Sequence, residues 1–516
     1  MLFNSYFFIV VFLPITVAGF FLLGRIGRHT WALGWLVAAS LLFYAWLNPI
    51  YLVIIAGSIL FNYYWGMLVG RGSKSLLAVG IAANLALLGY FKYANFFVDN
   101  LTVVTGMPVE LPPVVLPLAI SFYTFQQIAY LVDVYHCKTR ETSFLNYCLF
   151  VTFFPRLMQG PIVYHGEMMP QFARKEIFQF NPQMLSVGLT IFIFGLFKKV
   201  VIADGLALYA MPVFEAARHG YVLSFLEAWE GALAYTLQIY FDFSGYSDMA
   251  IGLAYLFGIR IPLNFNSPYK AVNIIDFWRR WHISLSRFLR DYLYIPLGGN
   301  RKGESRRFAN IMITMLLGGL WHGASWTFVI WGGLHGIFLV INHLWIKLKK
   351  QFGYRGGAGL ICRLCSCVLT FLSVTVAWVF FRSDSSATAF NVVRSMAGQN
   401  GFALPEKYLV KFGSLSAQLQ QWGVAFREMN YFEGSNEVIY LLLALLIVWI
   451  APNVQQMMNR YEPYLNIATK GGEKLPDPPG WLKWQPSFSW AVVFVICAMA
   501  SFLLLSRASE FLYFQF

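Results

Sequence analysis

Two of the eight histidines lie in sequence contexts suited to acid–base chemistry. His322 ends the run 318–322 (Gly-Gly-Leu-Trp-His) within a long apolar stretch, and His282 lies in the basic run 278–284 (Trp-Arg-Arg-Trp-His-Ile-Ser). Neutral imidazole is the natural general base for a hydroxyl group near pH 7, and such catalysis typically contributes about 10²–10⁴-fold. The two histidines therefore suggest a proton-handling pair.

An alternative role for His322 is a hydrogen bond between neighbouring helices. Ionisable residues deep in a membrane are rare and usually functional, which favours catalysis. The flanking glycines also permit a break in the helix and leave room for a substrate, and Trp321 and Trp326 could wall that space. His335 lies further along the same stretch, and we expect it to be structural.

Two arginines, Arg279 and Arg280, directly precede Trp281 and His282. Guanidinium groups bind phosphate and carboxylate with paired hydrogen bonds. At the inner membrane interface they would suit a large anionic cytoplasmic donor such as coenzyme A. The alternative is that these arginines face the membrane surface and only set the orientation of the chain in the membrane.

The familiar motifs of other catalytic classes are absent. The sequence contains no GxSxG elbow, no P-loop and no HExxH motif. Direct attack by an acceptor hydroxyl, with His322 as base, needs no protein nucleophile. The cysteine run at 362, 365 and 367 has no second ligand cluster, so we expect no metal site and no disulfide framework.

Composition indicates what kind of fold must position these residues. The chain is 58% hydrophobic and 12% charged, whereas soluble domains are about 45–50% apolar and about 25% charged. Lipid must therefore be the solvent. The net charge of +14 comes from Lys and Arg in short loops between apolar runs, which indicates topology signals and anionic lipid partners rather than nucleic-acid binding.

The apolar runs predict an all-α polytopic membrane protein with roughly 11–13 spans and both termini outside. The N-terminus has no positive region or cleavage site, so we interpret it as an uncleaved first span. The region 144–185 is ambiguous between a span and a re-entrant or interfacial element. The clearest spans are about Tyr6–Leu23, Trp31–Leu47, Ile50–Val69, Leu76–Val98, Val114–Tyr135, Leu185–Val201, Leu364–Phe381, Val438–Ile450 and Trp490–Leu505.

Three central segments need separate interpretations. Two apolar helices, 229–241 and 246–257, are predicted around the run 242–245 (Asp-Phe-Ser-Gly). The basic segment 270–307 begins with an amphipathic pattern, which predicts one helix along the inner interface. The apolar stretch 308–346 would be about 58 Å long as one helix, too long for one crossing. Basic residues flank it on both sides, so it should enter and return, with His322 roughly 22 Å deep near the turn.

These elements suggest three parts of the chain. Residues 1–113 would be N-terminal transmembrane helices. Residues 114–382 would form the catalytic core, including the basic segment and the hairpin. Residues 383–516 would supply an outer loop, from 383 to about 436, and the C-terminal helices.

Four ordered motifs give the chain a family resemblance. The runs 242–248, 278–284, 290–300 and 321–324 resemble the membrane-bound O-acyltransferase family, and are closest to its bacterial exopolysaccharide and alginate O-acetylation branch. The similarity covers about residues 1–345 and weakens beyond about 400. It implies a core with a central tunnel in the bacterial inner membrane.

The resemblance also implies roles for particular residues. His322 would be the catalytic base and His282 its partner, where an outer funnel meets a cytoplasmic tunnel. Acetyl-coenzyme A would be the donor substrate, with no permanently bound cofactor, and periplasmic transferases would complete acetylation of the polysaccharide. We expect donor-binding or tunnel residues at Trp278, Arg279, Arg280, Trp281, Ser284, Arg287, Asp291, Tyr292, Trp321 and Asp242.

Other functions remain open at this stage. Within the family, the alternative is D-alanyl transfer from a carrier protein. Outside it, the broken hairpin could be the gate of a transporter or flippase, or the chain could be a scaffold of an export complex. The polymer, whether alginate or cellulose in type, is also left open.

Overall fold

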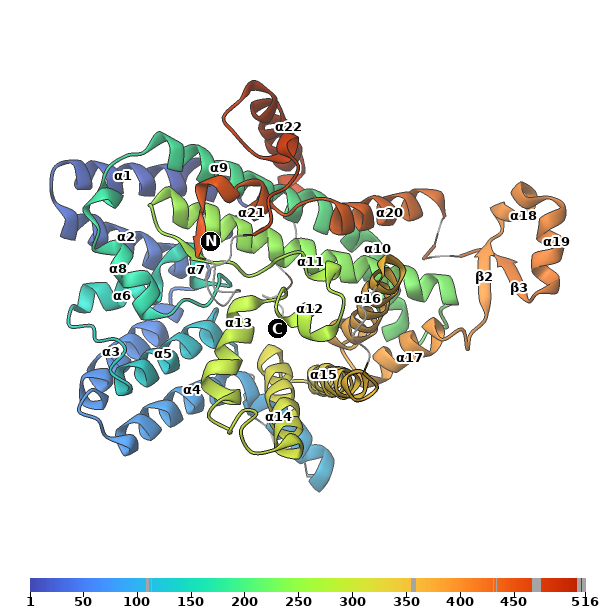
Figure 1. Cartoon of the computed structure of the whole chain (residues 1–516), viewed down its shortest axis with the longest axis horizontal. Coiled ribbons are helices and arrows are strands. Elements are labelled where there is room, and N and C mark those ends of the chain that lie inside the picture. Colours follow the sequence, from blue (N-terminus) through green and yellow to red (C-terminus); the bar gives the residue numbers. More distant parts are fainter. Residues whose placement is uncertain are drawn as a thin grey trace.

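A computed structural model describes the chain except for residues 108–110, 113, 354–358, 430, 433, 466–474, 508–511 and 513–516. The described part is predominantly helical, with two short pairs of parallel strands (Figure 1). Within it, seven helices are long and apolar enough to cross a membrane, and His29–Ala45 and Ser435–Ile450 are shorter apolar helices. The seven are Phe8–Arg25, Tyr51–Val69, Lys74–Thr105, Pro182–Arg218, Trp326–Gln351, Leu360–Arg382 and Phe488–Arg507.

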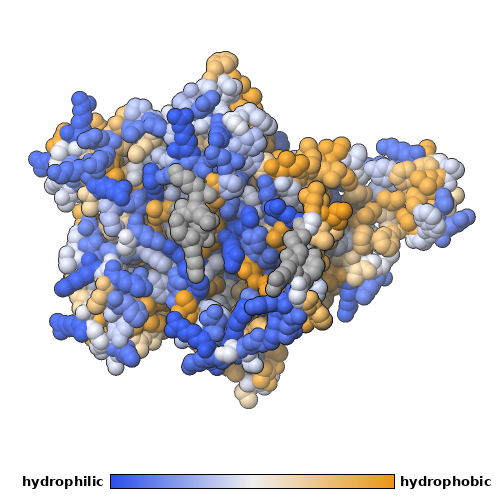
Figure 2. Space-filling model, viewed as in Figure 1, coloured by the Kyte–Doolittle hydropathy of each residue, from blue (hydrophilic) through white to orange (hydrophobic). Residues whose placement is uncertain are grey.

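This architecture confirms an all-α multi-pass membrane fold. The number of crossings in a bilayer, roughly 11–13, stays a prediction because the seven helices are counted by length and composition alone. Hydrophilic residues spread over the face seen in Figure 2, and hydrophobic residues gather over α20 (Ser435–Ile450). The three predicted parts of the chain also stay a prediction.

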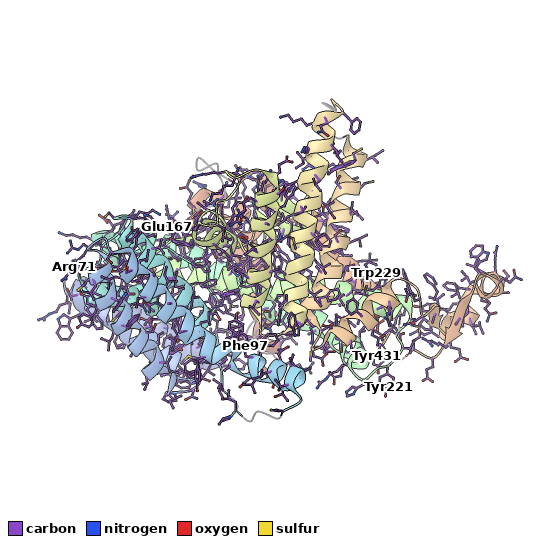
Figure 3. All side chains as sticks on the ribbon, turned by 90° about the horizontal axis from the view of Figure 1, so that it is seen from below. Arg71, Phe97, Glu167, Tyr221, Trp229 and Tyr431 are labelled. Atoms are coloured by element: carbon purple, nitrogen blue, oxygen red, sulfur yellow. The ribbon has the colours of Figure 1, made fainter. Side chains whose placement is uncertain are left out.

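The N-terminal helices match the predicted spans closely. The long helix α4 begins after Ser73, whose side chain accepts a hydrogen bond from the Leu76 amide, and ends at Gly106 in the left-handed conformation. Arg71, labelled in Figure 3, lies in the turn before this helix, and Phe97 lies in its second half. The first five helices are α1 (Leu13–Arg25), α2 (His29–Ala45), α3 (Tyr51–Val69), α4 (Lys74–Thr105) and α5 (Ile120–Tyr135).

The ambiguous region 144–185 contains no helix long enough to cross a membrane before the one that begins at Pro182. It folds into short elements whose apolar side chains are mostly buried inside the protein, including Phe150, Phe153 and Phe154. The elements are α6 (Phe144–Thr152), α7 (Phe154–Leu157), α8 (His165–Phe172) and the 3-10 turn η2 (Lys175–Phe178).

A single helix, α11 (Phe225–Leu256), crosses the centre of the molecule and is buried along nearly all of its length (Figure 1). The predicted break around residues 242–245 was therefore wrong. Glycines serve close helix packing here: a Cβ on Gly245 would lie 2.7 Å from the Gly195 carbonyl oxygen, and one on Gly252 would lie 2.5 Å from that of Gly188. The partners are α9 (Pro182–Phe197) and its continuation through η3 (Lys198–Ala203) into α10 (Asp204–Arg218).

The basic segment is not one interfacial helix, so that prediction was wrong too. It forms α12 (Ile274–Trp278) and α13 (Ile283–Leu289), followed by η5 (Arg290–Tyr294). The chain breaks between them because His282 adopts a left-handed backbone, with φ of +42°. The residues that define the predicted apolar face are all buried in the protein: Phe277, Trp281, Leu285, Phe288 and Leu289.

The predicted hairpin is confirmed as α14 (Glu304–His322) and α15 (Trp326–Gln351). Its turn lies at residues 323–325, directly after His322. Figure 3 shows the yellow and orange helices α14, α15 and α16 (Leu360–Arg382) standing side by side. Gly319 faces Gly332 at the contact, since a Cβ on either would lie within 2.3 Å of a carbonyl oxygen of the other helix.

The predicted outer loop contains folded elements. Four of them form an arm that projects from the body at the right of Figure 1: β2 (Phe402–Pro405), α18 (Lys407–Phe412), α19 (Ser414–Gln421) and β3 (Val424–Arg427). Strand β1 (Ile261–Pro262) pairs in parallel with β4 (Tyr464–Leu465). The remaining α-helices are α17 (Ser386–Met396), α21 (Val454–Met457) and α22 (Phe488–Leu504).

Candidate active site

His322 is the last residue of α14 and is surrounded by aromatic rings. Its imidazole lies edge-on to the rings of Trp331 and Phe381, each with a centroid distance of 5.1 Å. Both histidines are buried: 5% of the His322 residue surface is exposed, and none of the His282 surface. Apolar aromatic walls favour the neutral imidazole, which is the form that accepts a proton.

The end of α14 is held by two consecutive residues of α4. The Lys92 ammonium donates to the carbonyl oxygens of Trp321 at 2.5 Å and His322 at 3.1 Å. The Tyr93 hydroxyl donates to the carbonyl oxygen of Leu320 at 2.8 Å. These carbonyls belong to the last turn of the helix, where a cation also interacts favourably with the helix dipole.

The turn after His322 is set by a close contact with α15. Gly323 has an extended backbone, with φ of −165°, and a Cβ placed on it would lie 2.1 Å from the Phe328 ring. Gly319 lies against the Phe328 carbonyl in the same way. These two glycines therefore serve tight helix packing rather than leaving space for a substrate.

His282 is positioned by an unusual backbone and by Asn264. Left-handed backbone is uncommon for residues other than glycine, and such strained positions cluster at functional sites. The Asn264 Oδ1 accepts hydrogen bonds from the Ser284 amide at 3.2 Å and hydroxyl at 2.7 Å, and lies 3.4 Å from His282 Nδ1. The Ser284 hydroxyl in turn accepts a hydrogen bond from the Ile162 amide at 2.9 Å.

The ring of Trp321 lies near both histidines. Its centroid is 4.9 Å from that of His322 and 6.3 Å from that of His282. The indole stacks on Phe125 of α5 at 5.2 Å and is 5% exposed. The hairpin and the basic segment therefore place the two predicted catalytic histidines around one buried indole.

The other tryptophans of the basic run pack inside the core. Trp281 is buried between Phe265 and Trp378, with centroid distances of 5.0 and 4.9 Å. Trp278 lies 5.9 Å from Trp331, the ring that also contacts His322. Trp278 is thus connected to the site through one aromatic ring, whereas Trp281 has the packing of a structural residue.

The predicted donor-binding arginines differ in their surroundings. Arg279 is exposed. Arg280 is half-buried and donates to Asp276 at 2.9 Å. Arg287 makes two hydrogen bonds to Glu167, at 2.5 and 2.8 Å, and lies over the Tyr164 ring. Only Arg279 of the three therefore projects into solvent.

Asp291 and Tyr292 extend the same polar cluster. The Tyr164 hydroxyl donates to Asp291 at 3.3 Å, and the Tyr292 hydroxyl donates to Asp133 at 2.9 Å. Burial raises the pKa of the Tyr164 phenol, so it remains a neutral donor. These residues tie η5 to α5 and α8.

Asp242 does not join the histidines. Its carboxylate pairs with the Lys199 ammonium at 2.7 Å and accepts the Leu512 amide at 3.2 Å. Lys199 also pairs with Asp204, and the neighbouring Lys198 pairs with Asp248 at 2.6 Å. This network joins α11 to η3 and α10, which is a structural role for the predicted residue.

Comparisons with known proteins place this architecture in a family. The model of the "MBOAT, membrane-bound O-acyltransferase family" matches residues 134–362, a range that contains both histidines. The Peptidoglycan O-acetyltransferase of Helicobacter pylori is 45% identical over 78% of this chain and 81% of its own length. The chain belongs to the membrane-bound O-acyltransferase family. It is an O-acyltransferase.

Further relatives fall into two groups. The Probable alginate O-acetylase AlgI of Pseudomonas aeruginosa is 41% identical to this O-acyltransferase over 79% of the chain and 76% of its own length. The Teichoic acid D-alanyltransferase of Bacillus subtilis is 29% identical over 46% of the chain and 61% of its own length. The O-acetylating relatives are thus more similar, and over a longer range, than the D-alanylating one.

Sequence reasoning missed several residues of the site. Lys92 is a lone cation inside the apolar run 76–98, and the rarity of ionisable residues within membrane spans could have identified it. Asn264 and Phe381 gave no such signal, because their roles depend on contacts with distant segments.

His335 is fully buried, and neither ring nitrogen has a hydrogen-bond partner in the part of the chain that the structure describes. Its ring packs on Trp331 at 4.8 Å. Across that part of the chain, no group of three or more His, Cys, Asp or Glu residues could hold a metal ion.

Proposed function

We propose that this O-acyltransferase takes acetyl groups from cytoplasmic acetyl-coenzyme A and passes them across the bacterial inner membrane for O-acetylation of a polysaccharide. The observation that carries the proposal is the position of His322. It ends a helix at the turn of a hairpin, its ring lies among aromatic rings, and the end of that helix is held in place by Lys92 and Tyr93. The names of the relatives support acetyl transfer to a polysaccharide.

In the proposed reaction, His322 acts as general base. It accepts the proton of the acceptor hydroxyl as the oxygen attacks the thioester carbonyl. A carbon–oxygen bond forms, the carbon–sulfur bond breaks, and the proton passes to the departing thiolate. His282 is proposed as the partner that, with Trp321, fixes the environment of the reacting imidazole. The exposed Arg279 is proposed to contact the donor phosphates.

The acceptor polymer is the next question. The relatives are named for peptidoglycan and for alginate, so both polymers are candidates, and the cellulose type stays open. Periplasmic transferases that complete the modification are proposed partners. D-alanyl transfer is less well supported, because the teichoic acid relatives match less than half of the chain.

The test is an assay in proteoliposomes with acetyl-labelled coenzyme A on the donor side. Wild-type protein should release coenzyme A and move label to an acceptor on the opposite side. His322→Ala should abolish both, while His343→Ala serves as a matched control near the far end of α15. Retained transfer by folded His322→Ala would exclude the proposed base. Movement of a solute without thioester cleavage would instead indicate a transporter.

A further inference from the structure

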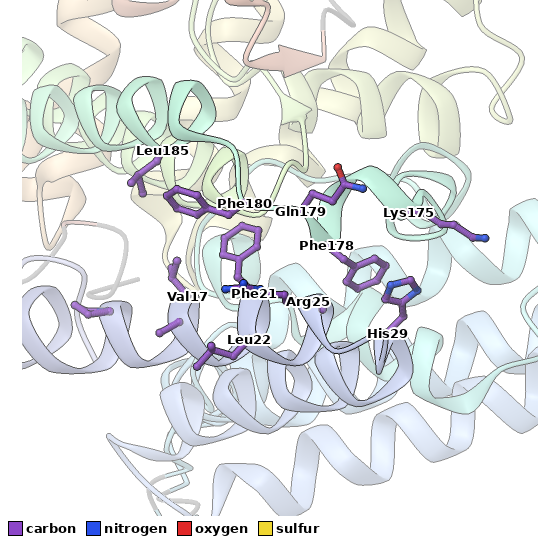
Figure 4. A pocket seen from close by; sticks show the side chains of 14 residues that line it. Val17, Phe21, Leu22, Arg25, His29, Lys175, Phe178, Gln179, Phe180 and Leu185 are labelled. Carbon is purple, nitrogen blue, oxygen red and sulfur yellow. The ribbon is translucent and has the colours of Figure 1, made fainter.

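A groove of about 950 Å³ opens between the cytoplasmic end of α1 and the segment that leads from η2 into α9 (Figure 4). The inner location follows from the positive-inside rule, since basic residues follow the first span. Apolar side chains line most of it: Pro14, Val17, Ala18, Phe21, Leu22, Phe178, Phe180 and Leu185. Leu22 is 63% exposed and Phe180 is 57% exposed, so the groove is open on its apolar side.

The wall of the groove is a packed structure. Phe21 meets Phe180 edge-on at 5.7 Å. Phe178 is buried and stacks flat on the ring of His29 at 4.2 Å. Gly24 lies close against Phe178, because a Cβ added to Gly24 would lie 2.8 Å from the carbonyl oxygen of Phe178. The shape is therefore set by contacts between α1, α2 and η2.

Three basic residues are among those that line the groove. Arg25 ends α1, His29 begins α2 and Lys175 begins η2. In Figure 4, His29 and Lys175 lie at one end, and Val17 and Leu185 lie at the other. Within the described part of the chain, neither Arg25 nor Lys175 forms an ion pair with a protein carboxylate, and no acidic residue lines the groove. Three separate elements thus each contribute a basic residue to the lining of a largely apolar groove.

We propose that this groove binds one anionic phospholipid of the inner leaflet. The phosphate-bearing headgroup contacts Arg25, His29 and Lys175, and an acyl chain lies along Val17, Phe21 and Leu185. Basic pockets between transmembrane helices on the cytoplasmic side are suited to such headgroups, because the membrane surface there is rich in anionic lipid. The proposal requires only that the chain lies in a membrane, and it is independent of the acyl-transfer chemistry.

The occupant is a lipid rather than a free anion, because the basic residues line the same groove as the apolar side chains. Inorganic phosphate would use only the charged end and leave Leu22 and Phe180 in contact with bulk lipid. An anionic phospholipid satisfies both ends at once. A zwitterionic lipid would fill the apolar slot but gain little from the positive charges of Arg25 and Lys175.

The test compares lipids retained by purified protein, using native mass spectrometry after titration with phosphatidylglycerol or phosphatidylcholine. Wild-type protein should retain phosphatidylglycerol preferentially. The double variant Arg25→Gln/Lys175→Gln should weaken that retention by about 10- to 30-fold, because each basic residue near the surface is worth about 1 kcal/mol. The variant Arg71→Gln/Lys74→Gln is the matched control, since it removes two exposed basic residues outside the groove.

A second variant separates shape from charge. Ala18→Trp fills the slot and leaves all three basic residues in place, so it should also lose phosphatidylglycerol. Equal retention of both lipids by wild-type protein would overturn the proposal, as would displacement of the lipid by inorganic phosphate alone. Unchanged retention by Ala18→Trp would overturn it too. If the double variant fails to fold, the wild-type titration and Ala18→Trp still decide.

Discussion

The ammonium of Lys92 lies 2.5 Å from the carbonyl oxygen of Trp321, the residue directly before His322. This hydrogen bond joins the middle of α4 to the end of α14, two elements far apart in the sequence. A half-buried cation within a membrane helix is costly unless its donors are satisfied. Here the final carbonyls of a second helix satisfy them, so the cost of burying Lys92 is offset at the point where His322 must be held.

Lys92→Met should therefore reduce turnover more than it reduces donor binding. Loss of the ammonium leaves two carbonyls at the end of α14 without their donor, and a shift of about 1 Å in a catalytic group can cost about 100-fold in rate. We expect kcat to fall by about that factor with KM for acetyl-coenzyme A within a few fold. Steady-state kinetics in proteoliposomes measures both.

Two variants control this prediction. Lys92→Arg keeps the charge and donors and should restore part of the activity. Lys74→Met removes an exposed lysine at the start of the same helix and should have no effect. If Lys92→Met lowers thermal stability but leaves kcat unchanged, the lysine only stabilises the helix end.

Asn264→Ala should disturb the placement of His282. The side-chain oxygen of Asn264 accepts from both the amide and the hydroxyl of Ser284, and burying such donors unpaired costs about 1–3 kcal/mol. Because these hydrogen bonds lie beside the strained backbone of His282, their loss should move this histidine and lower activity by at least tenfold. Ser284→Ala removes only one donor and should have a smaller effect. Equal activities of both variants and wild type would contradict this role.

The hairpin and the N-terminal spans were predictable because each is set by local pattern. An apolar stretch too long for one crossing and flanked by basic residues must return, and α14 and α15 do so with His322 at the turn. The spans near residues 6–98 follow from the length of apolar runs.

The break in α11 and the interfacial helix at 270–307 were wrong for a common reason. A glycine such as Gly245 can end a helix or allow another helix to approach, and only the partner decides which. A left-handed residue such as His282 is fixed by contacts with the distant Asn264. Neither partner can be read from local sequence.

Substitutions of Arg279 and of Arg280 should have different effects, although the two residues are neighbours in the sequence and were predicted to have the same role. Arg279 is exposed, whereas Arg280 is engaged with Asp276 and the Asn266 carbonyl. Arg279→Gln should weaken binding of acetyl-coenzyme A by roughly 10- to 100-fold if it meets a phosphate, since a charged hydrogen bond is worth about 1.5–3 kcal/mol. Arg280→Gln should instead lower thermal stability with little change in affinity.

Binding is measured by equilibrium titration with a non-hydrolysable acetyl-coenzyme A analogue, and unfolding by intrinsic fluorescence in detergent. Arg301→Gln, an exposed position in the same basic segment, is the control for loss of one positive charge. An unchanged affinity in Arg279→Gln would remove this residue from the donor site.

Gly245→Ala and Gly252→Ala should each destabilise the fold by about 1–3 kcal/mol, the usual cost of overpacking a core. The added methyl group would meet a carbonyl oxygen of α9 at 2.7 or 2.5 Å, so the two helices must separate. Gly89→Ala is the control, because its Cβ would meet nothing within 4 Å and alanine favours the helix. Thermal unfolding in one detergent ranks the three variants. A melting temperature for Gly245→Ala equal to that of Gly89→Ala would show that α9 and α11 do not pack through these glycines, because a contact this close has no flexible side chain that could move aside.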